Sequence, residues 1–532
     1  EAGVAIHDQA GLESALNGVL AHIAPIALDH LDGPGLKAAA LLADWASRQA
    51  APEAARLAFN LDPLGALART GLLEDGIDAA HRRTAALTET LALRFPKASI
   101  LRIDARPVHE AGGGEAQELA ALIAQAVDLL RRLAAHGITP AFAVPRLVFT
   151  LAVDANYGVG IAKLRAARRL WARCLEAMEI DAHPMVLQAV TSMRMLSRYD
   201  AWVNMLRNTG ACFAAAVGGA DIVTVRAFNE ALGTPDGLGR RIARNTQIIA
   251  MEESHLGKVA DPAGGAWFTE TVAETLAQAA WEEFQRIEAE GGYGESLLQD
   301  AFQARIAATR QARQTDIARR KIELTGVSTF PLLDGVEAAP ESPETAPSTA
   351  DTVTDEALRR ILPALAPGDG DPSMASPLFP VRLCEAFERL RDHAEAKTAR
   401  DGHRPAVFIA ALGPLAEHTA RADFARGFFA AGGIAAAEAD TELHSHEALA
   451  RAAAASGCRL AVLCGSDARY GAEAAEAARA LKAAGVERLY LAGRPGDHEA
   501  ALRAAGIDEF IHVGVDVVAA LELAHSELEI GA

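Results

Sequence analysis

The sequence has 532 residues, of which half are hydrophobic and only 5% are aromatic. This length exceeds what a single hydrophobic core usually supports, so we expect two or more domains. The 70 acidic and 51 basic side chains give a formal net charge of −19, which disfavours nucleic acid and anionic membranes as partners.

The cysteines and the apolar runs indicate a cytoplasmic protein. Five cysteines, an odd number without a CxxC pair, predict neither a disulfide framework nor a zinc site. These are Cys174, Cys212, Cys384, Cys458 and Cys464. No apolar run is long enough to span a membrane, and no basic-then-apolar leader opens the sequence.

Residues 1–335 alternate short apolar runs with longer helical patterns. The runs predicted as strands are 23–30, 55–63, 99–107, 146–154, 184–190 and 221–228. Residues 115–137 carry apolar side chains at helical spacing and stop at Gly137, which predicts an amphipathic helix. Repeated strand–helix units predict a parallel α/β sheet, and their number favours a closed (β/α)8 TIM-type barrel, with an open doubly wound sheet as the alternative. Because Glu1 and not Met opens the sequence, we expect the barrel's N-terminal part to be missing.

The rest of the chain predicts a connector and a second α/β domain. Residues 336–356 are rich in Pro, Ser, Thr and acids and read as an exposed linker, and a helical stretch follows at about 376–399. Residues 336–403 thus connect to a last unit, 404–532, with predicted strands at 406–412, 459–465, 488–493 and 509–514. We expect a flavodoxin-like three-layer domain there, with ligand sites at the carboxyl ends of its strands.

Four segments, together with the last domain, carry a specific resemblance over most of the chain from about residue 95 onward. The segments are HEAGGGEAQELA (109–120), GGADIVTVRAFNEALGTP (218–235), RRIARNTQIIAMEES (240–254) and KVADPAGGAWFTE (258–270). They resemble the methylmalonyl-CoA mutase family. The resemblance implies a barrel that binds coenzyme A, a C-terminal cobalamin-binding domain, and radical rearrangement of acyl-CoA carbon skeletons with adenosylcobalamin.

The resemblance also implies a cobalt ligand, and this sequence departs from it. The family carries Asp-x-His-x-x-Gly after the first strand of its cobalamin domain, where the His lies under cobalt and the Asp orients it. Aligned without gaps, these positions are Leu415, Glu417 and Ala420. A carboxylate is a poor substitute for neutral imidazole, and Leu415 cannot orient a ligand by hydrogen bonding. The adjacent His418 lacks an Asp partner, so we do not expect it to bind cobalt.

The corrin-binding groove implied by the resemblance is altered as well. The family's Ser-x-Leu segment corresponds to Gly465-Ser466-Asp467, which places a charge where an apolar contact is expected. The family's Gly-Gly pair reads Ala492-Gly493, and Arg494-Pro495 follows it. The added methyl group and basic side chain would crowd a site that needs backbone close to its ligand.

The barrel positions that face substrate in the family have lost their polar groups too. Pro107 stands where the family's Gly-Tyr-His places the His that holds the thioester carbonyl, and proline has no side-chain donor. His109 lies at the family's Gln position and is a weak candidate to replace it. The Gln, His and Asn of a later strand become Asp221, Thr224 and Arg226, and Glu230 alone persists nearby.

A retained framework with lost polar groups predicts a pseudoenzyme. We therefore interpret the chain as the non-catalytic small subunit of a heterodimeric methylmalonyl-CoA mutase, with no catalytic, cofactor-binding or metal-binding residue of its own. Its partner would be a catalytic large subunit that binds adenosylcobalamin and the acyl-CoA, and interconverts (R)-methylmalonyl-CoA and succinyl-CoA in propionate metabolism. The holoenzyme would be an isomerase, an intramolecular transferase. Two alternatives stay open: an independently active acyl-CoA mutase with a displaced cobalt ligand, and a transient chaperone or regulatory module of a mutase.

Overall fold

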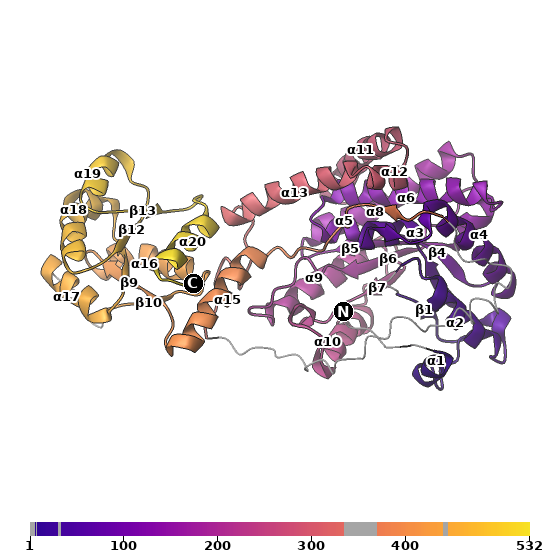
Figure 1. The fold of residues 1–532 in the computed structure, drawn as a ribbon, viewed down its shortest axis with the longest axis horizontal. Helices are drawn as coiled ribbons and strands as arrows, with labels where there is room; N and C mark the ends of the chain where they lie inside the picture. The colour runs from indigo at the N-terminus through magenta and orange to yellow at the C-terminus, as the bar shows by residue number, and fades with distance from the viewer. Residues whose placement is uncertain (1–5, 7, 30–32, 335–369, 440–444, 532) are drawn as a thin grey trace. The chain divides into compact units, whose positions relative to one another are not determined.

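The computed structural model describes residues 6, 8–29, 33–334, 370–439 and 445–531, so the predicted linker 336–356 lies outside the described residues. The chain folds into two units, whose elements are labelled in Figure 1. The first unit comprises Glu1–Leu196, Asn204–Arg310 and Ala339–Arg382. The second unit comprises Ser197–Val203, Gln311–Ala338 and Leu383–Ala532. No helix in the described ranges is both long and apolar enough to cross a membrane.

Six parallel strands form the sheet of the first unit, in the order β1-β2-β4-β5-β6-β7. They are β1 (Ile26–Ala27), β2 (Leu57–Leu61), β4 (Ser99–Asp104), β5 (Leu147–Val153), β6 (Leu187–Thr191) and β7 (Ile222–Thr224). All six predicted strands are confirmed, most of them shorter than predicted. The order follows the chain in one direction, as in a barrel, and does not reverse as in a doubly wound sheet. Within the described ranges β1 and β7 are the two edges, so a curled half-barrel is observed and closure to eight strands stays a prediction.

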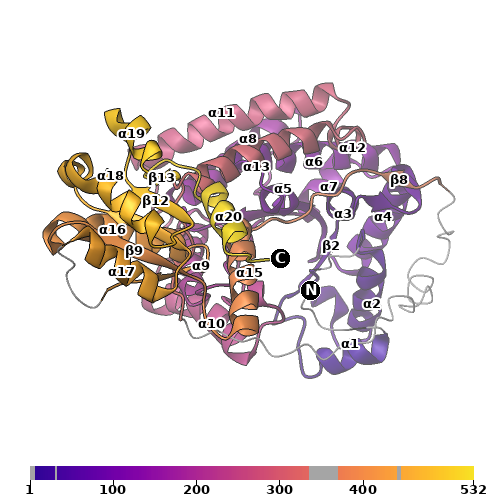
Figure 2. The ribbon, with the colours of Figure 1, turned by 60° about the vertical axis from the view of Figure 1, so that its left-hand side comes forward.

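Helices follow the strands and cover the outside of this sheet. The helix predicted at 115–137 is confirmed as α6 (Glu115–Ala135), and α11 (Trp267–Ala289) packs along both α6 and α8 (Tyr157–Ala177) (Figure 2). The other helices that begin in this unit or at its border are α1 (Gln9–Ala15), α2 (Leu36–Ser47), α3 (Pro63–Thr70), α4 (Gly76–Arg94), α5 (Arg106–Glu110), α7 (Pro140–Ala143), α9 (Val203–Val217), α10 (Gly237–Ile248), α12 (Tyr293–Leu298) and α13 (Ala301–Ala318). A short antiparallel pair, β3 (Leu72–Leu73) with β8 (Ser373–Met374), completes the unit.

Local sequence explains where the elements near the strand ends begin and stop. In α3, the side chain of Asp62 accepts a hydrogen bond from the N–H of Gly65 at 2.7 Å, and Pro63 occupies the first turn. The helix ends at Gly71, whose φ of 72° suits glycine. This cap fixes Asp62 at the carboxyl end of β2.

The second unit contains a five-stranded parallel sheet in the order β10-β9-β11-β12-β13. Its strands are β9 (Ala406–Ala411), β10 (Ala435–Ala437), β11 (Leu460–Cys464), β12 (Arg488–Ala492) and β13 (Glu509–Ile511). In chain order this is 2-1-3-4-5, the flavodoxin-like arrangement. The four predicted strands are confirmed, and β10 was not predicted.

Helices cover both faces of this second sheet, which gives three layers. One core lies against α15 (Glu385–Asp401), α16 (Leu415–Ala430) and α20 (Val517–Glu527). The other lies against α17 (His446–Ser456), α18 (Asp467–Ala483) and α19 (Glu499–Ala504). The helix predicted at about 376–399 begins only at Glu385, because Pro377 and Pro380 interrupt its first part.

Candidate functional site

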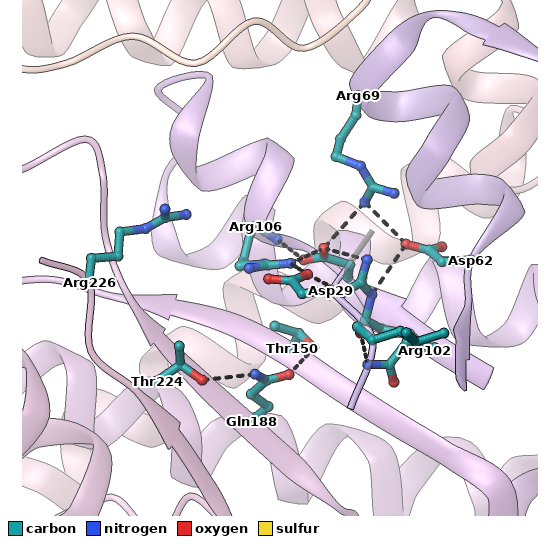
Figure 3. A network of polar contacts seen from close by, with 12 residues as sticks. Asp29, Asp62, Arg69, Arg102, Arg106, Thr150, Gln188, Thr224 and Arg226 are labelled. Atoms are coloured by element: carbon teal, nitrogen blue, oxygen red, sulfur yellow. Dashed lines mark hydrogen bonds and ion pairs between the residues drawn. The ribbon is translucent and has the colours of Figure 1, made fainter. Parts of the chain in front are cut away.

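Acidic side chains gather at the carboxyl ends of the first three strands of the half-barrel. Asp29 follows β1, Asp62 follows β2 and Asp104 ends β4. Parallel strands end on one edge, and barrels of this kind carry their active sites on the loops at that edge. Figure 3 shows Asp29 and Asp62 facing a set of arginines. We therefore expect a substrate site, if the barrel has one, at this edge.

Three arginines neutralise these aspartates. Arg106 binds Asp104 with two nitrogens, at 2.9 Å from Nε to Oδ1 and 2.8 Å from Nη2 to Oδ2. Arg102 Nη1 lies 2.6 Å from Asp29 Oδ1. Arg69 Nη1 lies 3.3 Å from a carboxylate oxygen of Asp104 and at the same distance from one of Asp62 (Figure 3). Three guanidinium groups thus face three carboxyl groups, and burial raises the pKa of one of these, Asp62.

The pKa shifts follow from this pairing. Burial alone would raise the pKa of Asp104, but Arg106 and Arg102 hold it well below its usual range. The same two guanidinium groups outweigh burial at Asp29 and lower the pKa of that carboxyl to about 2. These arginines are thus committed to internal carboxylates and are not arranged to receive an anionic substrate.

His109 lies in a second polar cluster, at the carboxyl ends of β5 and β6. Its Nε2 is 2.8 Å from the hydroxyl of Ser192, and its Nδ1 is 3.4 Å from Glu118 Oε2. The order Ser, His, Glu is that of a nucleophile with its base and orienting acid. However, Ser192 and His109 are both fully buried, and burial lowers the pKa of His109 to about 3. Such a histidine is a weak base, and the hydroxyl is out of reach of a substrate.

The same cluster has the spacing of a cation site. One ligand atom each from His109, Glu115 and Glu118 lie within 4.8 Å of one another. Lys163 extends from α8 into this space, where its Nζ lies 2.7 Å from Glu118 Oε2 and contacts Glu115 as well. The ammonium group supplies the positive charge that a metal ion would bring. The geometry therefore favours a structural ion-pair network.

Pro107, the residue at the expected carbonyl-binding position, lies in the first turn of α5. It is buried between Arg106 and Val108 and offers no hydrogen-bond donor from its side chain. The neighbouring donor, Arg106, is bound to Asp104 as described above. The loss of the carbonyl-binding donor at this position stays a prediction.

The polar residues at and after β7 also bind other protein groups. Gln188 donates to Thr224 Oγ1 at 3.0 Å, along the line of polar side chains in Figure 3. Arg226 binds Glu230 at 2.6 Å and the carbonyl oxygen of Thr191 at 3.0 Å. Asp221 accepts from Arg168 at 2.9 Å. The structure thus brings Arg226 and the retained Glu230 together as an ion pair.

The expected cobalt-ligand position lies at the carboxyl edge of the second sheet. Glu417 is in the first turn of α16, and its Oε2 accepts from Arg469 Nε at 2.8 Å and from the hydroxyl of Ser466 at 3.3 Å. The hydrogen bond from Arg469 lowers the pKa of Glu417. Glu417, aligned with the family's cobalt ligand, and Ser466, in the segment aligned with the corrin-binding groove, are therefore in contact at one edge of the sheet.

The neighbours of Glu417 differ in what they could offer a metal ion. Leu415 is 63% exposed and carries no polar group. His418 Nδ1 lies 3.1 Å from the carbonyl oxygen of Gly413, a contact that orients the ring. Ser466 caps α18 by accepting from the N–H of Arg469. Gly493 has a φ of 156°, which favours glycine at that turn.

Sequence reasoning missed the aspartate cluster and Lys163. A signal for the aspartates was available, because an Asp ends or follows several of the predicted apolar runs. The partner Arg69 gave none, since Arg69 and Asp104 are 35 residues apart in the chain. Lys163 gave none either, because a lysine in an amphipathic helix usually faces solvent.

Residues 1–362 match a family model described as methylmalonyl-CoA mutase. The chain belongs to the methylmalonyl-CoA mutase family. It is 44% identical over 512 residues to the methylmalonyl-CoA mutase small subunit of Streptomyces virginiae, a match that covers 96% of this chain and 77% of that protein. It is 32% identical over 514 residues to the small subunit of Propionibacterium freudenreichii subsp. shermanii, covering 95% of this chain and 74% of that one.

A further relative is the mitochondrial methylmalonyl-CoA mutase of Bos taurus, 35% identical over 245 residues, or 45% of this chain and 33% of that protein. The similarity to the two bacterial small subunits therefore covers about twice as much of this chain. The resemblance drawn from the four segments is confirmed, and the family is one of isomerases.

Proposed function

We propose that this chain is the non-catalytic small subunit of a heterodimeric, adenosylcobalamin-dependent methylmalonyl-CoA mutase. Its partner, the catalytic large subunit, binds the cofactor and interconverts (R)-methylmalonyl-CoA and succinyl-CoA, and this chain supports that subunit in the cytoplasm. The observation that carries the proposal is the 2.8 Å contact between Glu417 and Arg469. A carboxylate held by a guanidinium group stands where the family resemblance implies a neutral imidazole.

The residues around Glu417 do not fit a corrin with a histidine below its cobalt. A histidine ligand needs a carboxylate or carbonyl to fix its tautomer, and the orienting position is the aliphatic Leu415. A change of Glu417 alone would also leave Arg469 without one of its carboxylate partners. We therefore assign the cofactor to the large subunit and no cofactor to this chain.

The half-barrel supports the same conclusion. Catalysis on a thioester needs a donor aimed at its carbonyl oxygen, and Pro107 provides none. The arginines at this edge bind internal aspartates, and Arg226 binds Glu230. We therefore assign residues 1–335 to a mutase-type barrel, residues 336–403 to a connector and residues 404–532 to a degenerate cobalamin domain.

An independently active mutase would need another cobalt ligand. His418 is the nearest candidate, and its Nδ1 faces the carbonyl oxygen of Gly413 at 3.1 Å. The buried Ser192–His109 pair is the other arrangement with catalytic geometry, and it has no access for a substrate. Burial therefore disfavours a catalytic role for the Ser192–His109 pair, and the variant His418→Gln tests the other candidate.

Co-expression with a catalytic large subunit tests the proposal. We expect a one-to-one complex that survives gel filtration, as an extensive interface between obligate partners would give, with mutase activity in the complex only. The variants Glu417→Gln and His418→Gln on this chain should leave that activity within twofold. Turnover by the purified chain alone would contradict the proposal, and a complex that dissociates on the column would indicate a transient chaperone or regulatory module.

A further inference from the structure

Three glycines end three neighbouring strands of the second sheet. Gly413 follows β9, Gly465 follows β11 and Gly493 follows β12. Gly413 and Gly493 have positive φ, at 77° and 156°. Glycines at the carboxyl ends of parallel strands allow a ligand to approach the backbone closely. At all three positions in this chain, side chains of the protein itself occupy that space.

Side chains of α16 and α18 lie against all three glycines, and Leu412 lies 3.1 Å from a methyl group placed on Gly465. A methyl group on Gly413 would lie 2.8 Å from Arg469 Nε. A methyl group on Gly493 would lie 3.0 Å from Arg421 Nη1 and 3.2 Å from the ring of Tyr470. The corresponding distance from Gly465 to the Tyr470 ring is 3.4 Å. The same tyrosine thus stands against two of the three strand ends.

Tyr470 is fixed there by its hydroxyl group. The side chain is 6% exposed, and its oxygen lies 2.8 Å from the carbonyl oxygen of Ala492 and 3.1 Å from that of Leu463. The oxygen also accepts a hydrogen bond from the N–H of Gly465 at 3.0 Å. The tyrosine therefore connects the ends of β11 and β12 by hydrogen bonds to backbone groups of both strands.

Arg421 covers the ring from the side of α16. Its guanidinium carbon lies 4.7 Å from the centre of the Tyr470 ring, the geometry of a cation–π contact. Arg421 also forms an ion pair with Asp467 at the start of α18. The two helices are thus joined across the strand ends by Arg421, Asp467 and Tyr470.

We infer that Tyr470, held by Arg421, closes the carboxyl ends of β11 and β12 to a ligand independently of the residue at position 417. The inference deepens the proposed function and rests on it for the class of ligand, a corrin. It adds that restoring the lost cobalt ligand is not enough to restore binding, because Tyr470 and Arg421 fill the edge at Gly465 and Gly493.

The test uses the full chain and adenosylcobalamin, with corrin absorbance measured after gel filtration. The restoring variant Leu415→Asp/Glu417→His/Ala420→Gly should retain less than about 5% of one equivalent. Addition of Tyr470→Ala to that variant should raise the retained corrin at least tenfold and shift its spectrum as histidine replaces the cofactor's own base. Tyr470→Ala alone should retain none, which is the matched control.

Two results would overturn the inference. Stoichiometric corrin on the restoring variant with Tyr470 intact would show that the tyrosine is no barrier. No corrin on the variant that combines both changes, with circular dichroism showing a folded protein, would show that the barrier lies elsewhere. Should Tyr470→Ala prevent folding, Arg421→Ala replaces it, because this change removes the α16 side chain that lies against Gly493. We then expect retained corrin when Arg421→Ala is added to the restoring variant, and none with Arg421→Ala alone. The proposed function fails on a different result, namely corrin retained by the unaltered chain.

Discussion

Removal of the buried ammonium group of Lys163 provides a sharp test of the first unit. The side chain is 1% exposed, and its Nζ lies 2.7 Å from Glu118 Oε2 and also contacts Glu115. Lys163→Met keeps most of the aliphatic stem and removes the charge, so two buried carboxylates lose their shared cation. Removing one partner of a buried ion pair costs about 3–5 kcal/mol. We expect a loss of that size in the free energy of unfolding at pH 8.

The deficit should shrink at lower pH. Burial, reinforced by the charge of Glu115, raises the pKa of Glu118 despite the opposing effect of Lys163. Without the lysine the pKa of Glu118 rises further, and the folded variant holds a proton that the unfolded chain releases above about pH 4.5. A raised carboxyl pKa stabilises at low pH, and that stability is lost as the pH rises through the folded-state pKa. Relative to the unaltered chain, the variant should therefore recover up to about 1.4 kcal/mol per pH unit on going from pH 8 to pH 7, because below a pKa of about 7 Glu118 binds the proton in both folded proteins.

Urea unfolding followed by tryptophan fluorescence measures both effects. Arg169→Met is the matched control, because Arg169 lies on the same helix and its ion pair with Glu274 is exposed. Exposed pairs contribute about 0–1 kcal/mol, so the control should unfold close to the unaltered chain. If Lys163→Met costs no more than Arg169→Met at pH 8, the buried network described above is wrong.

Three further predictions concern other buried groups. Burial lowers the pKa of His81 to about 4, so between pH 6.5 and 4 the unfolded chain binds a proton that the folded chain does not. As the pH is lowered through this range, the free energy of unfolding should decrease by about 1.4 kcal/mol per pH unit more steeply in the unaltered chain than in His81→Gln. Equal slopes in urea unfolding experiments would refute this. Trp171 packs 4.8 Å from Phe149, so Trp171→Ala should cost about 3–5 kcal/mol in urea unfolding, whereas Trp267→Ala, at a residue 86% exposed, should change stability by less than about 0.5 kcal/mol. Tyr470→Phe removes the partner of buried backbone groups in β11 and β12 and should cost about 1–3 kcal/mol by thermal unfolding; no change in the melting temperature would contradict its role there.

Strand prediction worked where the sequence carries β-branched and aromatic side chains. The run that becomes β5, Leu147–Val153, reads LVFTLAV and is buried along its whole length. The run that becomes β10, Ala435–Ala437, is three alanines without such a signal, and its pairing with β9 decides its conformation. Local sequence therefore identified strands whose side chains favour the extended conformation. It missed β10, which is extended because it pairs with β9.

The candidate sites divide in the same way. Alignment placed Glu417 at a position of interest, and the departure from histidine was visible in the sequence alone. What Glu417 contacts was not visible, because Arg469 lies 52 residues further along the chain. Tyr470 was missed for a related reason, since a tyrosine in the first turn of a helix carries no signal of hydrogen bonds to two strand ends. Contacts between distant segments require the fold.

The central claim is that this chain supports a mutase without holding its cofactor. The most direct measurement is the corrin absorbance retained after gel filtration of the purified chain mixed with adenosylcobalamin, alone and with a catalytic large subunit. We predict no corrin on the chain alone, and one equivalent together with mutase activity in the one-to-one complex. Stoichiometric corrin on the chain alone would contradict the account, because it would require a cobalt ligand other than the Glu417 position and an open carboxyl edge at Tyr470.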